Sequence, residues 1–269
     1  MTEPRIGAAM DIRFGTTVES FMKYVTDLGL DHVEFKREYL AGHPNTPSPE
    51  RVGELADEYG VTLSYHAPFR DWNMGSYDET VRQDSVARVK RTIDDAATAG
   101  ATSVVVHGGS IPHRYPEWVR QRARKNARRS LAECAEYAQL AGVSLCLENQ
   151  PIDEQKRRYT TSPADLAAMI EDVDVPPQYL SVTLDVGHAK VNDHDYQAFV
   201  EKFGQRIRVC HLHDNDGSAD QHKPFPEYQS VVESVPANVF VFEMKSPEDV
   251  ATSVGADVVA PEPEVSADD

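Results

Sequence analysis

Residues 180–188 read LSVTLDVGH and place a run of β-favouring residues directly before an aspartate and a histidine. Eight such runs occur along the chain, at residues 6–10, 32–35, 61–65, 103–106, 143–147, 180–184, 207–212 and 239–242. Longer segments with helical spacing separate them, including residues 17–28, 78–99 and 118–140. Strands that alternate with helices predict a parallel sheet. Eight repeats favour a closed α/β barrel, the (β/α)8 TIM barrel, over an open doubly wound sheet.

The ends of the predicted helices are also marked in the sequence. Ser48, Ser162 and Ser246 each precede a proline, which predicts a capping hydroxyl followed by proline at the first helical position. No internal linker is recognisable, so we expect a single barrel domain over residues 1–255. Residues 256–269 are acidic, contain proline and lack an apolar period, and we expect a disordered tail there.

The composition is that of a chain that folds in water. Hydrophobic residues make up 40% of the 269 residues. No apolar run approaches the roughly 18 residues that span a bilayer, and no signal peptide is recognisable. Cys134, Cys146 and Cys210 are widely spaced and form no paired motif. We therefore expect reduced thiols and a cytoplasmic chain without a membrane partner.

The net charge is -17, and lysine is scarce, with 9 Lys against 18 Arg. Excess acid with few lysines indicates a halophilic protein that works at high internal salt. In molar salt the Debye length falls to about 3 Å, so long-range repulsion between polyanions is screened. The negative charge still argues against a nucleic-acid partner, but with less weight than it would have at low salt.

Side chains of the kind that bind metals recur where the predicted strands end. They are His66 in SYHAPF, His107 in VVVHGG, Glu148 in LCLENQP, Asp185 and His188 in TLDVGHA, His211 in CHLHDND, Asp220 and His222 in DQH, and Glu243 in VFEMK. In a barrel these strand ends converge on one face, where active sites form. Nine imidazoles and carboxylates in one mouth would repel each other without compensating charge, which a cluster of divalent cations supplies.

Each of these residues also has a purely structural explanation, as a hydrogen-bonded histidine or a helix-capping acid. Six consecutive strands that all end in such a side chain favour one shared site over six independent explanations. The other histidines that lie away from strand ends are expected on the surface: His32, His43, His113 and His194. Asp214, Asn215 and Asp216 are expected in a turn.

In this order, the segments resemble the xylose-isomerase-like barrel superfamily. That superfamily includes sugar and sugar-phosphate isomerases and epimerases, and also endonuclease IV-type apurinic endonucleases. The similarity runs from about residue 6 to residue 254 and covers nearly the whole chain. The ordered set of motifs is specific for the superfamily but not for the reaction.

The resemblance to epimerase-type members implies one metal held by Glu148, Asp185, His211 and Glu243. Glu148 and Glu243 would then move a proton on opposite faces of the substrate, as general base and acid, through a metal-stabilised enediolate. His188 would contact the sugar.

The resemblance to endonuclease-type members implies a larger metal site. His66, His107, Asp220 and His222 would join the set to hold three zinc ions, which activate water for attack on a phosphodiester. The mixture of imidazole and carboxylate ligands favours Zn or Mn over Mg or Ca. Because all nine positions of this pattern are filled, we expect more than one metal per chain.

The sequence departs from both patterns. The texts HDN at residues 213–215 and KPFP at residues 223–226 stand where the endonucleases carry a polar-Asp-Ser stretch and a Gly-rich loop. No arginine follows Arg208, so the substrate arginine of the epimerases is absent or its role is taken by Lys223. The loop at residues 155–159, QKRRY, is a further candidate contact for a phosphate.

We therefore expect a divalent-metal-dependent isomerase or epimerase of sugars or sugar phosphates, with Arg70, Trp72, His188 and Lys223 as substrate contacts. The alternative is an apurinic-site endonuclease with a trinuclear zinc site and DNA as its partner, favoured by the complete nine-residue set. A third interpretation is a non-catalytic barrel that keeps metal for stability and binds a ligand. It is favoured by the missing Gly-rich loop and the missing arginine.

Overall fold

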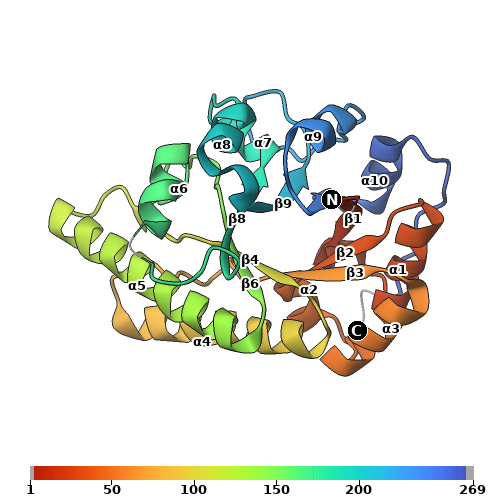
Figure 1. Cartoon of the computed structure of the whole chain (residues 1–269), viewed down its shortest axis with the longest axis horizontal. Coiled ribbons are helices and arrows are strands. Elements are labelled where there is room, and N and C mark those ends of the chain that lie inside the picture. Colours follow the sequence, from red (N-terminus) through yellow and green to blue (C-terminus); the bar gives the residue numbers. More distant parts are fainter. Residues whose placement is uncertain (1–2, 172, 265–269) are drawn as a thin grey trace.

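The computed structural model describes residues 3–171 and 173–264. Eight parallel strands close into a barrel in the order β1-β10-β9-β8-β6-β4-β3-β2 (Figure 1). The strands are β1 (Arg5–Met10), β2 (His32–Lys36), β3 (Thr62–His66), β4 (Ser103–His107), β6 (Ser144–Glu148), β8 (Leu180–Asp185), β9 (Ile207–Leu212) and β10 (Val239–Phe242). The predicted barrel is confirmed, and each predicted strand is found with its ends within one residue of those expected.

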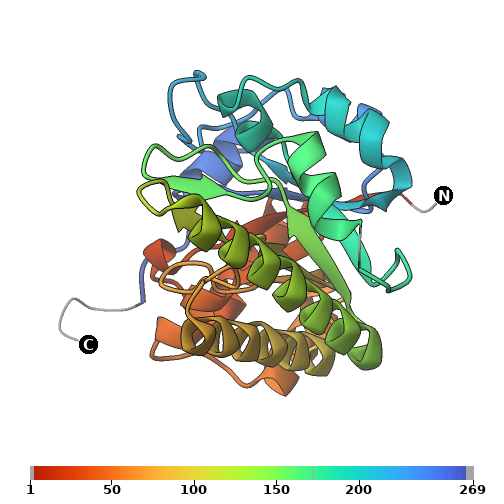
Figure 2. The same cartoon turned by 90° about the vertical axis from the view of Figure 1, so that its left-hand side faces the viewer.

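Helices surround the barrel. They are α1 (Val18–Asp27), α2 (Arg37–Gly42), α3 (Pro49–Tyr59), α4 (Glu79–Thr98), α5 (Glu117–Ala141), α6 (Pro163–Ile170), α7 (Val186–Val191), α8 (Tyr196–Phe203), α9 (Gln229–Ser234) and α10 (Pro247–Val254). The two longest, α4 and α5, run side by side along one flank (Figures 1 and 2). Ser48, Ser162 and Ser246 cap α3, α6 and α10 as expected. Of the helices in the described ranges, none combines the length and the apolarity needed to cross a membrane.

Two short strands that the sequence did not reveal pair antiparallel outside the barrel: β5 (Ser110–Pro112) and β7 (Lys156–Arg158). They follow β4 and β6, so they stand at the carboxyl end of the barrel. The glycines of the VVVHGG motif permit this connection. A Cβ on Gly108 would lie 2.6 Å from the Thr160 methyl group, and Gly109 adopts a φ of 87°, which favours glycine.

Alternate residues of each strand face the inside of the barrel. An apolar layer fills the centre, and it consists of Ala9, Val105, Cys146, Val209, Val239 and Val241. Two residues beyond this layer most strands carry a polar side chain, as at Asp11, His107, Glu148, His211 and Glu243. The two-residue period of a strand therefore places a polar layer directly above the apolar one, at the carboxyl end.

The segment for which we expected disorder lies against the barrel over residues 256–264. The Glu264 carboxylate accepts hydrogen bonds from the hydroxyls of Thr17, at 3.0 Å, and Ser20, at 2.6 Å. Its backbone N–H donates to the carbonyl of Gly15 at 2.8 Å. The N-terminus of a helix attracts a carboxylate, and composition alone does not reveal this contact with α1. Residues 265–269 of the expected tail lie outside the described residues.

Candidate active site

A cavity of about 430 Å³ opens at the carboxyl end of the strands. Seven of the nine residues singled out by the sequence line it: His66, His107, Glu148, His188, Asp220, His222 and Glu243. The other two, Asp185 and His211, are completely buried beside them. The structure thus brings all nine residues together at the expected end of the barrel.

Glu148 lies at the centre of the group. One of its carboxylate oxygens is 3.2 Å from His66 Nε2 and 2.9 Å from His107 Nε2. The other oxygen is 3.3 Å from His188 Nδ1 and 3.4 Å from His211 Nδ1. A single carboxylate at the end of β6 therefore joins side chains from β3, β4, α7 and β9.

Asp220 joins a second set of imidazoles. Its Oδ2 lies 3.3 Å from His188 Nε2 and 3.2 Å from His222 Nε2. His222 has a φ of 52°, in the left-handed region that non-glycine residues seldom occupy, and its Nδ1 lies 2.6 Å from the carbonyl oxygen of Glu243. Such backbone strain persists where the surrounding contacts fix it, and it concentrates at functional sites.

The charges of the site balance one another. Burial raises the pKa of the Glu148 carboxyl, but attraction by His107 and hydrogen bonds from several imidazoles outweigh it, so that pKa lies well below its ordinary value. Burial lowers the pKa of His188, but Asp185 and Asp220 outweigh it, so that pKa lies well above its ordinary value. The His188 imidazole thus supplies positive charge beside the buried carboxylates.

The residues fit a divalent metal. Groups of imidazole and carboxylate atoms that lie within 4.8 Å of one another include His66 with His107 and Glu148, Glu148 with Asp185 and His211, and His188 with His213, Asp220 and His222. Within the described ranges, several fully buried polar atoms here form no hydrogen bond, namely both ring nitrogens of His211, Nδ1 of His213 and Oδ1 of Asp220. Three of them lie within ion-pair distance of an oppositely charged group, and Nδ1 of His213 does not. Buried polar atoms normally form hydrogen bonds, so lone pairs at these positions are suited to a metal ion.

Three buried residues of the site were not singled out from the sequence. Glu34, on β2, has its Oε1 3.1 Å from His211 Nε2. Lys36, two residues on, has its ammonium 3.0 Å from Glu243 Oε1 and 3.4 Å from Asp11 Oδ2. Both residues continue the inward-facing series of β2, which begins at His32. A spacing of two along that strand is the signal that could have revealed them.

His213 is the third such residue. It follows His211 by two, and its Nε2 lies 3.1 Å from Asp185 Oδ1. Its ring stacks on that of His222, with 4.0 Å between centroids and 18° between planes. Gly187 makes room for it, because a Cβ at that position would lie 2.0 Å from His213 Cε1. The glycine of the LDVGH motif is therefore required by the close approach of this imidazole.

Two expectations about side-chain position were wrong. His32 was expected on the surface but is completely buried at the start of β2, where its ring nitrogens contact the hydroxyls of Thr62 and Ser64 at 2.8 and 2.9 Å. His43 is also buried, stacked on Tyr39. Lys223, expected to contact substrate, is half exposed and pairs with Asp216 at 3.0 Å, away from the cavity lining. Backbone pairing between Asp214 and Lys223 directs that side chain outward.

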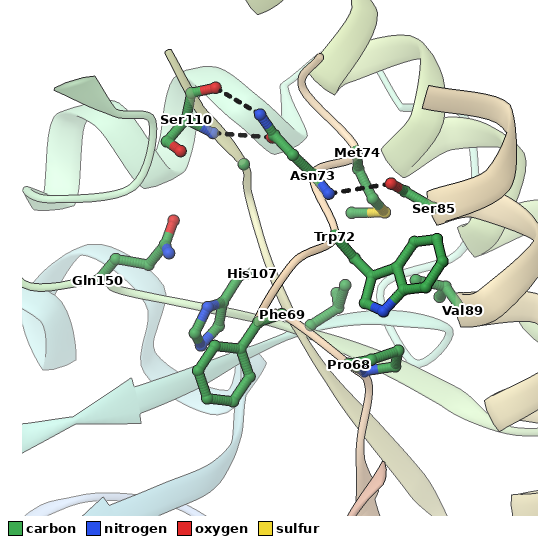
Figure 3. A pocket seen from close by; sticks show the side chains of 12 residues that line it. Pro68, Phe69, Trp72, Asn73, Met74, Ser85, Val89, His107, Ser110 and Gln150 are labelled. Atoms are coloured by element: carbon green, nitrogen blue, oxygen red, sulfur yellow. Dashed lines mark hydrogen bonds between the residues drawn. The ribbon is translucent and has the colours of Figure 1, made fainter. Parts of the chain in front are cut away.

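Of the other expected substrate contacts, His188 and Arg70 line the main cavity, whereas Trp72 lines a neighbouring cavity of about 400 Å³. Trp72 borders a small pocket of about 50 Å³ (Figure 3), and the Arg88 guanidinium lies 4.6 Å from the centre of its ring. Phe69 and His107 separate this pocket from the main cavity, with their ring centroids 4.5 Å apart. Asn73 exchanges two hydrogen bonds with the backbone of Ser110, which ties this loop to β5 (Figure 3).

The family described as xylose isomerase-like TIM barrel matches residues 22–254. The chain belongs to this family. Similar proteins include the uncharacterized protein MJ1311 of Methanocaldococcus jannaschii, which is 33% identical over 171 residues, or 63% of this chain and 57% of that protein. The match therefore spans little more than half the length of that relative. The fructoselysine 3-epimerase of Shigella flexneri is 25% identical over 218 residues, covering 76% of this chain and 74% of that protein.

Among solved structures, a D-tagatose 3-epimerase-like protein is similar to this chain with a TM-score of 0.77 and 27% identity, over 93% of this chain and 94% of that one. The 3-keto-D-glucoside 4-epimerase YcjR of E. coli has a TM-score of 0.73 at 17% identity, over 94% of this chain and 97% of that one. The second likeness concerns the fold alone.

Proposed function

We propose that this chain is a divalent-metal-dependent sugar epimerase or isomerase. The observation that supports this most directly is the pair Glu148 and Glu243. They stand at the ends of β6 and β10, three strands apart in the eight-strand ring, and both line the same cavity. Two carboxyl groups on different sides of one substrate suit removal of a proton from one face and its return to the other. The similarity to a fructoselysine 3-epimerase and to a D-tagatose 3-epimerase-like protein agrees with this chemistry.

In the proposed reaction, one carboxylate accepts the proton from the carbon next to the substrate carbonyl. The electron pair of that C–H bond moves toward the carbonyl oxygen and leaves an enediolate. The other carboxyl group, in its acid form at that step, protonates the carbon from the opposite face. Lys36 holds Glu243, and four imidazoles hold Glu148, so neither carboxyl group rotates freely.

Glu148, Asp185, His211 and Glu243 are the residues that we propose to hold the metal next to the reacting carbons. A divalent metal at this position, with Zn or Mn the best fit to the mixed ligands, supplies Lewis acidity to the oxygens that gain negative charge. His66, His107, His188, Asp220 and His222 complete further ligand sets, so we propose more than one metal per chain. His188 also borders the cavity, and we propose that it contacts the sugar.

The second candidate is an apurinic-site endonuclease, favoured by the convergence of all nine residues of the trinuclear pattern on one cavity. Purified chain in molar KCl with Mn or Zn should be assayed on a panel of ketoses and, in parallel, on a duplex that contains an abasic site. Chelator-sensitive nicking without any ketose turnover would replace the epimerase proposal with this one.

The proton transfer is tested by Glu148→Gln and Glu243→Gln. An amide cannot accept the proton, so each variant should lower turnover about 10²- to 10⁴-fold and stop the incorporation of solvent deuterium at the substrate carbon. Glu117→Gln, at an exposed glutamate that begins α5, serves as the matched control and should keep wild-type turnover. Deuterium exchange that persists in both site variants would rule out the proposed pair.

A further inference from the structure

Positive charge gathers at the mouth of the cavity although the chain as a whole is strongly acidic. The chain has only 9 lysines and a net charge of -17. Six cationic side chains line the cavity, and three of them are lysines: Arg13, Lys36, Arg70, Lys156, Arg158 and Lys245. One third of all lysines thus line a single cavity, so cationic side chains are concentrated there relative to the rest of the chain.

Three of these cations stand where the main cavity meets a second one. The neighbouring cavity, of about 400 Å³, shares Arg13, Lys36, Phe69 and Arg70 with the main cavity. We call Arg13, Lys36 and Arg70 the junction cations. Consider a substrate whose reacting carbons lie between Glu148 and Glu243. If it extends past Lys36, its far end contacts Arg13 and Arg70.

The junction is held in place by a buried carboxylate. Asp11 accepts two hydrogen bonds from Arg13, from Nε at 2.7 Å and from Nη2 at 2.8 Å. The same carboxylate lies 3.4 Å from the Lys36 ammonium. The side chains of Asp11 and Lys36 are only 5% and 8% exposed, whereas that of Arg13 is 42% exposed. Asp11 thus holds the Nε–Nη2 edge of the Arg13 guanidinium, and the remaining donors of that side chain are free to bind a ligand.

The Arg70 guanidinium forms no ion pair with a carboxylate. It lies 5.4 Å from the centre of the Phe69 ring. Across residues 3–171 and 173–264, no carboxylate lies within the 4.0 Å of an ion pair to it. Glu38 and Asp71 line the neighbouring cavity as well, but Glu38 accepts from the backbone N–H groups of Phe69 and Arg70, at 3.3 and 3.4 Å. Arg13 and Lys36 pair with the carboxylates of Asp11 and Glu243, so Arg70 is the junction cation whose side-chain donors no carboxylate engages.

We propose that the junction cations bind an anionic group, a phosphate or a carboxylate, on the sugar substrate. This inference rests on the proposed function, because it assigns the substrate class of the same site. The guanidinium groups suit such oxyanions, since their planar donors match a phosphate or a carboxylate. Lys36 lines both cavities, and its ammonium lies 3.0 Å from Glu243, one of the two proposed catalytic carboxylates. It therefore lies between the reacting carbons and the proposed anion site.

The test compares charged and neutral ketoses in molar KCl with Mn. D-fructose 6-phosphate and D-tagatose 6-phosphate carry a phosphate, D-fructuronate carries a carboxylate, and D-fructose and D-tagatose are neutral. Binding is measured by calorimetry and turnover separately, for the wild type, for Arg70→Gln and Arg13→Gln, and for the control Arg51→Gln. Arg51 lies on α3 and pairs with Glu54 and Glu58, outside both cavities.

We expect an anionic ketose to be bound and turned over in preference to its neutral counterpart. Each junction variant should weaken binding of the anionic ketose about 10- to 100-fold, as the loss of a hydrogen bond to a charged group predicts, and should weaken binding of the neutral ketose by much less. Arg51→Gln should behave as the wild type. Preference for fructuronate over the phosphates would identify the anion as a carboxylate, and the reverse preference would identify it as a phosphate. Either result supports the junction.

Other results separate this inference from the proposed function. Equal use of neutral and anionic ketoses, unaffected by both variants, would overturn the anion subsite and leave the epimerase proposal standing. Binding of ketose phosphates that depends on Arg70, without turnover of any ketose, would support the subsite and contradict the epimerase. Nicking of abasic DNA that depends on Arg70, with no ketose phosphate bound, would overturn the assignment of a sugar substrate.

Discussion

Replacement of Gly187 by alanine should displace the His213 ring. A Cβ at Gly187 would lie 2.0 Å from His213 Cε1 and 2.3 Å from Nδ1, whereas ordinary contact begins at 3.4 Å. The ring therefore has to move by about 1.4 Å, the difference between 3.4 and 2.0 Å, or helix α7 has to move by a similar amount. Stacking on His222 at 4.0 Å leaves the ring little room to retreat.

This shift has two measurable consequences. Overpacking of a filled interior costs about 1–3 kcal/mol of unfolding free energy. The same movement breaks the 3.1 Å contact between His213 Nε2 and Asp185 and disturbs the ligand set of His188, His213, Asp220 and His222. We therefore expect Gly187→Ala to lower both the urea midpoint and the zinc content of protein that is purified with excess zinc.

The double variant Gly187→Ala/His213→Ala separates the two effects. Removal of the imidazole relieves the clash, so part of the lost stability should return, but the zinc content should stay low. Elemental analysis and urea unfolding of the two variants and the wild type provide the measurements. Wild-type stability together with wild-type zinc content in Gly187→Ala would refute the close packing of this glycine on His213 and the metal set built on it.

Two further predictions concern the first metal set and the barrel interior. Replacement of both His66 and His107 by alanine should lower the number of metal ions bound per chain, but the metal at Glu148, Asp185, His211 and Glu243 should remain. Anomalous scattering of wild-type crystals measures the metal count. A single metal in the wild type, with neither histidine as a ligand, would contradict the prediction. Burial lowers the pKa of His32 to about 4, so the unfolded chain, with a histidine pKa near 6.5, binds a proton between pH 6.5 and 4 that the folded chain does not. Stability should be complete above about pH 6.5 and fall by up to about 3 kcal/mol toward pH 4, and His32→Gln should flatten that part of the curve in urea titrations; an unchanged slope would argue against a neutral buried His32.

The sequence was sufficient for the barrel because its signals are local. Runs of β-favouring residues and capping serines before prolines act within a few residues, and the structure places strands and helix starts where those signals predict them. The pair β5 and β7 was missed because each strand has three residues and pairs with a segment more than 40 residues away. No local pattern distinguishes such a strand from a loop.

The residues that converge at the end of the barrel could also be picked out from local sequence patterns. Most of the nine residues were recognised because they follow an apolar run at or near its carboxyl end, whereas Asp220 and His222 were recognised from the DQH segment that follows β9. Glu34 and Lys36 lie inside or at the end of β2, where a charged residue within a strand ordinarily indicates exposure, so their burial depends on pairing across the barrel with His211 and Glu243. His32 was misplaced for the same reason: its partners, Thr62 and Ser64, come from the neighbouring strand β3.

The number of protein ligands in each set bears on how firmly that set would hold zinc. Structural zinc sites have four protein ligands, whereas catalytic sites have three and keep one position open. His213 gives the set of His188, Asp220 and His222 a fourth ligand, while His66, His107 and Glu148 form a set of three. We infer that the set with His213 would hold zinc more firmly than the set of three. His213→Ala tests this inference: one equivalent of zinc should bind more weakly, whereas epimerase turnover and the metal at Glu148 should be kept. Wild-type zinc affinity in His213→Ala would contradict it, because the third imidazole of the set would then contribute nothing to binding.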